Sequence, residues 1–297
     1  GEDGNNGADD NDNSGTLKYV SIRHGGTDIG AGNEINGLSL GAVGMGTVID
    51  HIEVIANIDD GVEFFGGAAQ ISHCFVSLVG DDSYDYDEGF HGYGQFWVAL
   101  QGELTGDRCA EQDGGDGGDE ESAPYAEPMI YNATYIGNHL GAFVIFRDNA
   151  AGTYANSIFH NSAKGIRFEY RDDKHSSYDW LTDASPAATL MIKNCLFSEL
   201  GSKDVASSIY SKAEHGTLPG DATTVCASVF NNNSNAIESV LPADDDPTAI
   251  DPAADVSASV NPTAAKPAAA FFTTANYHGA FEPGGTNWAE GWTLYYK

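Results

Sequence analysis

The sequence predicts an all-β protein, a parallel β-helix (solenoid) of about seven coils with acidic loop insertions and a C-terminal capping segment. Three observations indicate this fold. Short strand-like segments recur at intervals of about 22 to 32 residues, as in solenoid proteins. The 36 glycines, 14 tyrosines and 14 phenylalanines favour strands and tight turns over helices. No long window shows the 3.6-residue apolar period of an amphipathic helix.

Each repeat is predicted to hold two strands separated by a turn. The first strand is a short apolar run with partial alternation, at residues 17–22, 48–54, 71–76, 129–135, 154–159 and 191–197. The second strand follows a turn and a glycine, at residues 36–40, 60–64, 140–145 and 163–168. Gly37 and Gly61 are 24 residues apart, as are Gly141 and Gly165. A glycine kept at one place suits a corner with positive φ or a close backbone contact.

Asparagines recur at the same position in three coils, which favours coils that stack in parallel. Asn132, Asn156 and Asn194 are placed to hydrogen-bond from coil to coil as a ladder, which suits stacked coils better than a β-sandwich. A leucine-rich repeat is excluded because no L-x-x-L-x-L spacing recurs.

The chain is expected to fall into three parts. These are an acidic lead-in at 1–16, the β-helix at 17–240 with insertions at 102–128 and 172–188, and a strap rich in proline and alanine with an aromatic cap at 241–297. Asp10–Gly15 resembles the start of a calcium loop, but Ser21 stands where the closing glutamate belongs, so a solvated lead-in is favoured. Residues 113–121 are expected to form a solvated acidic loop.

Acidic residues dominate the charge, because 44 Asp and Glu against 13 Lys and Arg give a formal net charge of −31. Phosphates would be repelled, so nucleic-acid binding is excluded. The absence of an apolar run of about 18 residues argues against a membrane span. Two explanations of the acidity stay open, a solvated shell suited to salty water and carboxylates that bind divalent cations. Because Gly1 is not a native start, we expect a processed or trimmed product.

The four cysteines show no C-x-x-C spacing, which argues against a zinc or redox motif. Cys74 and Cys195 lie in apolar strand-like runs and are predicted to be buried thiols. Cys109 and Cys226 lie nearer to loops and are candidates for a disulfide.

One acidic sequence motif, called an acidic phrase below, occurs in two consecutive repeats. Residues 57–65 (NIDDGVEFF) are followed by residues 81–90 (DDSYDYDEGF), so that Asp81 lies 22 residues after Asp59. Carboxylates that stack this closely repel one another unless a cation lies between them. We therefore predict a Ca²⁺ site with ligands drawn from Asp59, Asp60, Glu63, Asp81, Asp82, Asp85, Asp87 and Glu88.

The segment Asn57–Phe64 (NIDDGVEF) resembles the motif Asn-Ala-Asp-Asp-Gly-aromatic-Asp of calcium-dependent pectate lyases of polysaccharide lyase family nine. The resemblance covers barely one coil. It implies a right-handed parallel β-helix in which Asp59, Asp60 and Glu63 bind calcium, with Glu63 in place of the family's usual aspartate.

A second set of motifs spans most of the chain: SGTLKYV at 14–20, NEINGL at 33–38, DEGF at 87–90, GAF at 279–281 and NWAEGWT at 287–293. They resemble a group of β-helix repeat proteins of marine and Gram-negative bacteria in the pectate-lyase-like superfamily. This resemblance implies a secreted or cell-surface protein and no established activity.

Lyase chemistry needs an unprotonated Lys or Arg near the cation, to remove the proton beside a uronate carboxylate. In the family this base lies about two coils beyond the calcium motif, where this sequence offers only Arg108. Lys164 and Arg167 lie about four coils along, on the order of 15 to 20 Å away at the spacing of parallel strands. Arg167 is expected to pair with Glu169 or Asp148 instead.

Other chemistries have weaker support. The histidines form no His-x-His or His-x-x-x-His pattern, so a transition-metal site is not expected, and His51 and His73 are predicted to stack. No Gly-x-Ser-x-Gly elbow indicates a hydrolase. A glycosidase using Asp85, Asp87 or Glu88 stays open, although several carboxylates in one patch suit a cation better.

Two functions follow. The favoured one is a non-catalytic, secreted or cell-surface β-helix stabilised by Ca²⁺, for adhesion, contact with acidic or neutral polysaccharide, or self-assembly into a homo-oligomer or filament through the strand edges of the terminal coils. The alternative is a calcium-dependent polysaccharide lyase acting on acidic glycans, with Arg108, Lys164 or Arg167 as the base.

Overall fold

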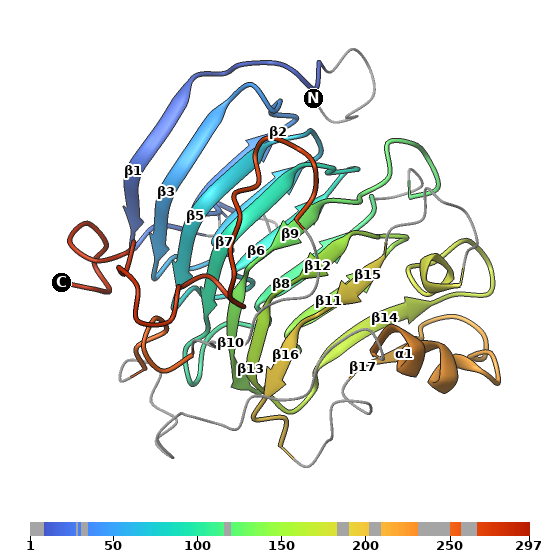
Figure 1. Ribbon diagram of the computed structural model, residues 1–297. Helices are drawn as coiled ribbons and strands as arrows, with labels where there is room; N and C mark the ends of the chain where they lie inside the picture. Colours follow the sequence, from blue (N-terminus) through green and yellow to red (C-terminus); the bar gives the residue numbers. More distant parts are fainter. Residues whose placement is uncertain are drawn as a thin grey trace.

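The chain winds as a right-handed parallel β-helix whose walls are two parallel sheets (Figure 1). The computed structural model describes residues 9–27, 29–30, 35–115, 120–182, 190–201, 209–230, 250–256 and 266–297. Each coil contributes one strand to a seven-stranded sheet, so the described strands form seven coils. The predicted fold is thereby confirmed.

The first sheet has ten strands. Four long strands are followed by three coils in which each strand is split into two. They are β1 (Thr16–Arg23), β3 (Val48–Ile55), β5 (Gln70–Ser77), β7 (Tyr93–Leu100), β9 (Met129–Tyr131), β10 (Thr134–His139), β12 (Thr153–Ala155), β13 (Ile158–Ser162), β15 (Met191–Lys193) and β16 (Leu196–Ser198).

The second sheet has seven shorter strands, paired in chain order. They are β2 (Leu38–Gly41), β4 (Val62–Phe65), β6 (Tyr84–Asp87), β8 (Ala110–Asp113), β11 (Val144–Arg147), β14 (Ile166–Tyr170) and β17 (Ile209–Ala213). Glycine before these strands permits close stacking of coils: a Cβ on Gly61 would lie 2.5 Å from the carbonyl oxygen of Ser83 in the next coil.

A residue with positive φ interrupts the first-sheet strand of every coil. Its φ lies between 53° and 59° at Tyr19, His51, His73, Phe96, Asn132, Asn156 and Asn194. Asparagine tolerates this conformation best, which accounts for its use in the last three coils. Asn194 Nδ2 donates to Asn156 Oδ1 at 2.7 Å, one step of the predicted ladder.

Rings replace asparagine at this position in the first four coils. They stack outside the sheet, with His51 and His73 centroids 4.4 Å apart at 24°, as predicted. Tyr19 continues the stack on one side, 4.4 Å from His51, and Phe96 on the other, 4.9 Å from His73.

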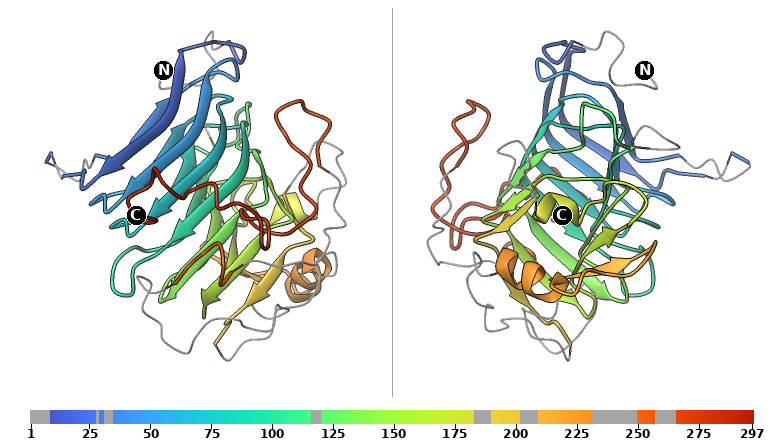
Figure 2. Two further views of the ribbon diagram at one scale, coloured as in Figure 1. Left: turned by 60° about the vertical axis from the view of Figure 1, so that its left-hand side comes forward. Right: turned by 90° about the vertical axis from the view of Figure 1, so that its right-hand side faces the viewer.

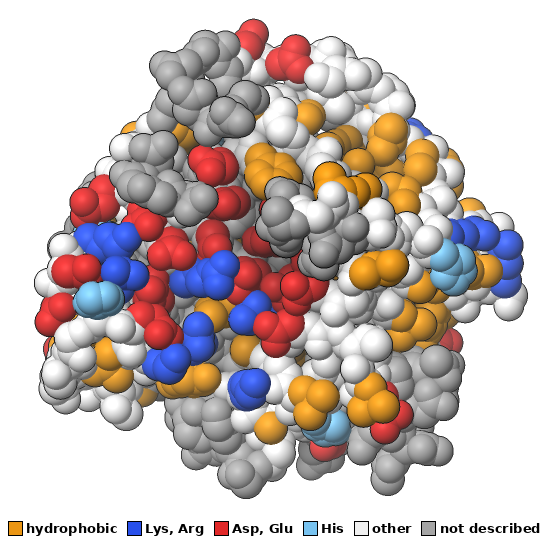
Figure 3. Space-filling model, turned by 180° about the vertical axis from the view of Figure 1, so that it is seen from behind, with side chains coloured by type: hydrophobic (Ala, Val, Ile, Leu, Met, Phe, Trp, Pro, Cys, Tyr) orange, Lys and Arg blue, Asp and Glu red, His pale blue; other side chains and the backbone are white. Residues whose placement is uncertain are grey.

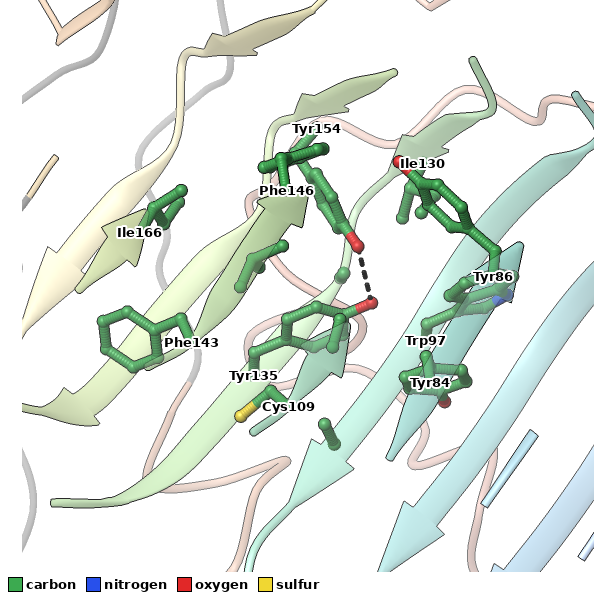
Figure 4. Close-up of a cluster of buried hydrophobic side chains, with 14 of the residues drawn as sticks. Tyr84, Tyr86, Trp97, Cys109, Ile130, Tyr135, Phe143, Phe146, Tyr154 and Ile166 are labelled. Atoms are coloured by element: carbon green, nitrogen blue, oxygen red, sulfur yellow. Dashed lines mark hydrogen bonds between the residues drawn. The ribbon is translucent and has the colours of Figure 1, made fainter. Parts of the chain in front are cut away.

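The core lies between the two sheets and is rich in aromatic residues (Figure 4). Buried tyrosines need partners for their hydroxyls. Tyr84 donates to the carbonyls of Cys74 and Val98, both at 3.0 Å. The hydroxyls of Tyr135 and Tyr154 lie 3.4 Å apart, the dashed contact in Figure 4.

The suggested disulfide between Cys109 and Cys226 is wrong. All four cysteines are buried free thiols. Cys109 lies in the core at the start of β8, whereas Cys226 lies on α1 (Ala222–Phe230), 3.2 Å from the hydroxyl of Ser211.

The predicted insertion 102–128 contains a regular strand. Ala110–Asp113 forms β8 and pairs with both β6 and β11, so this part of the insertion belongs to the fourth coil. Residues 116–119 of the predicted acidic loop lie outside the described residues, as do 183–188 of the second insertion, which contains the 3₁₀ helix η1 (Asp179–Leu181).

The C-terminal segment, residues 266–297, runs along the outer face of the first sheet (Figures 1 and 2). Glu53 Oε1 accepts the backbone N–H of Leu294 at 2.6 Å, and Gln95 Oε1 accepts that of Thr273 at 2.9 Å. Trp288 packs edge-on against His51 and His73. The described part of this segment therefore docks on the face of the sheet rather than over an end of the solenoid.

Helix α1 occupies that position, because it packs against β17 and β15 at the end of the last coil. Residues 1–8 of the lead-in and 241–249 and 257–265 of the strap lie outside the described residues. Residues 9–15 lie against the turn between β2 and β3 of the β-helix, where the N–H of Met45 donates to the Asp10 carbonyl at 2.7 Å.

Candidate metal centre

The two acidic phrases meet on the second sheet. β4 and β6 pair in parallel with Glu63 opposite Asp85 and Phe64 opposite Tyr86, which is the alignment inferred from the repeat. Within β4 the side chains of Val62 and Phe64 point inward and are fully buried, so Glu63 points outward. Figure 3, seen from behind Figure 1, shows acidic and basic side chains gathered on one face.

Two groups of three carboxylates share Asp60. Its oxygens approach Asp59 and Asp81 in one group, and Glu63 and Asp85 in the other. Within each group the candidate ligand atoms all lie within 4.8 Å of one another. Asp60 Oδ1 also accepts the backbone N–H of Asp82 at 2.9 Å, which fixes the carboxylate between the two coils.

Burial raises the pKa values of these carboxyls. Burial is the main cause for Asp60, whose pKa rises to about 8, and three neighbouring carboxylates add to the effect against an opposing backbone hydrogen bond. Burial and nearby carboxylates raise the pKa of Glu63 to about 7 and that of Asp85 well above its usual value. Without a cation, ionisation of this group is unfavourable.

No ion pair among the described residues involves Asp60, Glu63 or Asp85. Asp60 accepts a backbone N–H and Glu63 accepts Nδ2 of Asn36. Asp85 Oδ1 is buried and has no hydrogen-bond partner in the described part of the chain. Among the described residues, no side-chain cation pairs with these three carboxyls to balance negative charge at this place.

The neighbouring coils differ, because arginines balance their acidic residues. Arg108 pairs with Asp82 at 3.1 Å, Asp107 at 2.8 Å and Glu111 at 2.5 Å. Arg147 pairs with Asp113 at 2.7 Å and with Glu111 at 3.0 Å. Glu63 on β4 and Asp85 on β6 have no such arginine partner among the described residues.

Three predicted ligands lie at the margin of the two groups. Asp82 Oδ2 accepts a hydrogen bond from Nη1 of Arg108, while Asp82 Oδ1 is buried without a hydrogen-bond partner among the described residues. Asp87 lies opposite Phe65, and its Oδ1 accepts the N–H of Glu88 at 2.7 Å. Asp87 and Glu88 belong to neither group of carboxylates.

The candidate lyase bases lie in unfavourable places. Arg108 is close to the centre, but its three acidic partners hold its pKa above the usual value, so it stays protonated. Arg167 lies on β14, four strands from β4 in the order β4-β6-β8-β11-β14, and Lys164 lies in the turn before β14. Arg167 pairs with Glu214 at 3.8 Å, not with Glu169 or Asp148 as expected.

Sequence reasoning missed Asn36 and the arginine network. Asn36 precedes Gly37 as Asp60 precedes Gly61, so the repeat itself places it beside the centre. Its Oδ1 is buried without a hydrogen-bond partner among the described residues. Arg147 carried no signal, because its role depends on β8 lying next to β11.

The donor set suits calcium. Every candidate ligand is an oxygen, and Ca²⁺ binds six to eight oxygens at flexible geometry, whereas transition metals favour imidazole or thiolate. Carboxylates from two coils would hold the ion across the β4–β6 pair, which would neutralise the charges that burial penalises.

A family model described as a pectate-lyase-like β-helix domain matches residues 3–293. The chain belongs to this family. No curated protein and no solved structure matches it. Among the described residues, no helix is long and apolar enough to cross a membrane.

Proposed function

We propose that this pectate-lyase-like β-helix is a secreted or cell-surface protein in which Ca²⁺ clamps the coils of β4 and β6, and that it serves adhesion, glycan contact or self-assembly. The observation that carries the proposal is the shared Asp60: two carboxylate groups converge on it, and three of their members have no ion-pair partner among the described residues.

A structural role for the ion is favoured over a catalytic one. Lyase chemistry needs an unprotonated base beside the cation. Arg108, the nearby candidate, is held by three carboxylates. Arg167 is four strands away, on the order of 19 Å at 4.8 Å per strand.

Glycan contact has a separate support in Phe65. This ring lies on β4 two residues after Glu63 and on the same outer face, and it is 38% exposed. Aromatic rings stack on the apolar faces of sugars, and a cation beside the ring would bind hydroxyl or carboxylate oxygens. The proposed surface therefore suits a polysaccharide, with an acidic one favoured by the ion.

A binding assay on immobilised acidic and neutral polysaccharides tests glycan contact. Phe65→Ala is expected to weaken calcium-dependent retention at least fivefold. Leu104→Ala is the control, because Leu104 is 82% exposed and lies in the loop between β7 and β8. Equal retention of both variants would remove Phe65 from the surface.

Family membership keeps a calcium-dependent polysaccharide lyase as the second candidate. Absorbance of unsaturated uronate products over a panel of acidic polysaccharides separates the two functions. We expect no product with calcium present. Product formation that Lys164→Ala, Arg167→Ala or Arg108→Ala abolishes would establish the lyase.

A further inference from the structure

The five carboxylates of the candidate metal centre occupy two kinds of place in the fold. Glu63 on β4 and Asp85 on β6 lie opposite one another in paired strands. Asp59 and Asp81 precede these strands, in the turns that join β3 to β4 and β5 to β6. Asp60 belongs to both groups of carboxylates. We call Asp60, Glu63 and Asp85 the strand site, and Asp59, Asp60 and Asp81 the turn site.

One ion cannot contact all five side chains. Ca²⁺ binds oxygens at about 2.3 to 2.6 Å, so two oxygens on one ion lie at most about 5 Å apart. Candidate ligand atoms meet this limit within each site, where they all lie within 4.8 Å of one another, but the five carboxylates do not form a single set. Their formal charge of −5 when ionised also exceeds the charge of one Ca²⁺. Geometry and charge therefore favour an ion in each site.

A buried carboxylate oxygen supports the turn site. Asp82 is 2% exposed, and its backbone N–H donates to Asp60 Oδ1 at 2.9 Å. Arg108 donates to Oδ2 of Asp82, whereas Oδ1 is buried without a hydrogen-bond partner among the described residues. Burial raises the pKa of Asp82 against the charge of Arg108, and nearby Asp60 and Asp81 add to the rise. Asp82 therefore offers a further carboxylate oxygen to the turn site.

Buried oxygens also surround the strand site. Oδ1 of Asp85 is buried without a hydrogen-bond partner in the described part of the chain. The same holds for Oδ1 of Asn36, whose Nδ2 donates to Glu63 and so places the amide beside this site. Carboxylate and amide oxygens are ligands that Ca²⁺ prefers. Each site thus has buried oxygens that accept no hydrogen bond from the described residues, as ligands of a cation would.

We infer that this centre holds two Ca²⁺ ions, one in the strand site and one in the turn site, bridged by the carboxylate of Asp60. Metal ions in two-metal sites lie about 3.5 to 4 Å apart, and a carboxylate between them offsets their mutual repulsion. The inference rests on the calcium clamp of the proposed function and adds a second ion to it.

The two ions differ in their access to solvent. Asp81 of the turn site is exposed, whereas Glu63 and Asp85 of the strand site are partly buried. Because Ca²⁺ takes six to eight oxygens, the ion of the turn site keeps open positions for water or for an oxygen of a glycan. The ion of the strand site is the more enclosed of the two.

Isothermal titration calorimetry counts the ions. We expect two Ca²⁺ per native chain. Asp81→Asn and Asp85→Asn each remove a charge from one site and keep the size of the side chain. Each should weaken its own site at least tenfold, so that one ion remains at concentrations that fill both sites of the native chain, and Asp60→Asn should lose both ions. Asp87→Asn is the matched control, because Asp87 lies on β6 and belongs to neither site.

The number of ions separates this inference from the clamp itself. One ion per native chain overturns the second site and leaves the clamp intact, whereas no binding overturns both. Loss of all binding in Asp81→Asn and also in Asp85→Asn shows a single shared ion and overturns the inference. Glu63→Gln repeats the test of the strand site, with the same result expected as for Asp85→Asn.

Luminescence of Tb³⁺ tests which ion is open to solvent. Tb³⁺ binds the same oxygens as Ca²⁺, and its lifetimes in H₂O and D₂O report the number of bound water molecules. The ion that remains in Asp85→Asn, at the turn site, should hold more water than the ion that remains in Asp81→Asn. An equal number of water molecules in the two variants would overturn the assignment of the open positions to the turn site.

Discussion

Asp60→Asn is the sharpest perturbation of the calcium clamp, because Asp60 belongs to both carboxylate groups. The substitution keeps the size of the side chain and an oxygen that can accept the N–H of Asp82, and it removes the charge. An effect on calcium response can then be separated from damage to packing.

The expected magnitude follows from linkage. An ion that binds only the folded chain stabilises it by about 2.7 kcal/mol at 100 times its Kd. For a chain of this size, each kcal/mol raises Tm by roughly 2 °C, so saturating calcium should raise the native Tm by about 5 °C. For Asp60→Asn we expect a rise below about 1 °C.

In chelator, the pKa of Asp60 predicts that the native chain is no more stable than Asp60→Asn. Its folded-state pKa of about 8 lies above the usual 3.8, so stability from this group is present at low pH and is lost as pH rises toward 8. At pH 8 without calcium, Asp60→Asn should therefore be at least as stable as the native chain. With calcium it should be less stable.

Calorimetric melts of the native chain and of Asp60→Asn, in chelator and in saturating calcium, test this reversal in their order of stability. Glu103→Gln, which changes an exposed acidic residue outside the centre, should keep the native response to calcium. The reasoning is refuted if Asp60→Asn lowers Tm equally in both conditions, or if calcium leaves the native Tm unchanged.

Three further predictions concern the scaffold around the centre. Arg108→Ala should lower the free energy of unfolding by about 3 kcal/mol, because it leaves the buried Asp82 without its cation and Glu111 with Arg147 alone. Lys212→Ala at an exposed pair should cost less than about 1 kcal/mol in urea melts. Asn194→Ala should cost about 1 to 2 kcal/mol more than Asn194→Gly, because alanine is strained at positive φ; equal urea midpoints for the two variants would contradict this. Burial lowers the pKa of His51 against the opposing charge of Asp50, so the contribution of His51 to stability is present above pH 6.5 and is lost as pH falls below it. His51→Asn, which places the asparagine of the later coils at this position, should therefore reduce the loss of Tm between pH 7.5 and 5.5. An unchanged loss of Tm would exclude His51 as the cause.

The coils could be predicted because each one repeats the same local demands. Alternating residues such as Val62 and Phe64 fill the core, and Gly61 allows the next coil to approach. The same register brings Glu63 opposite Asp85, so the acidic centre was accessible from the spacing of two phrases. The ion itself stays a prediction.

Strand β8 was hidden by its polar composition. Glu111, Gln112 and Asp113 lack the apolar alternation of the other strands, and Gln112 is buried because its side-chain oxygen accepts the hydroxyl of Tyr154. A polar residue facing inward with a distant partner leaves no local pattern. The arginine network depends on β8, so it was missed for the same reason.

The place of the C-terminal segment depended on contacts between distant residues. Glu53 and Leu294 are 241 residues apart, and Gln95 and Thr273 are 178 apart. The aromatic density of the segment correctly indicated that it packs against the solenoid. No local pattern distinguishes packing on the face of the sheet from packing on its end.

A crystal structure grown in calcium tests the central claim most directly. The clamp predicts an anomalous difference peak between β4 and β6, with oxygens of Asp60, Glu63 and Asp85 within about 2.3 to 2.6 Å of the ion. The same carboxylates without a peak at saturating calcium, or bridged by a protein cation, would contradict the account.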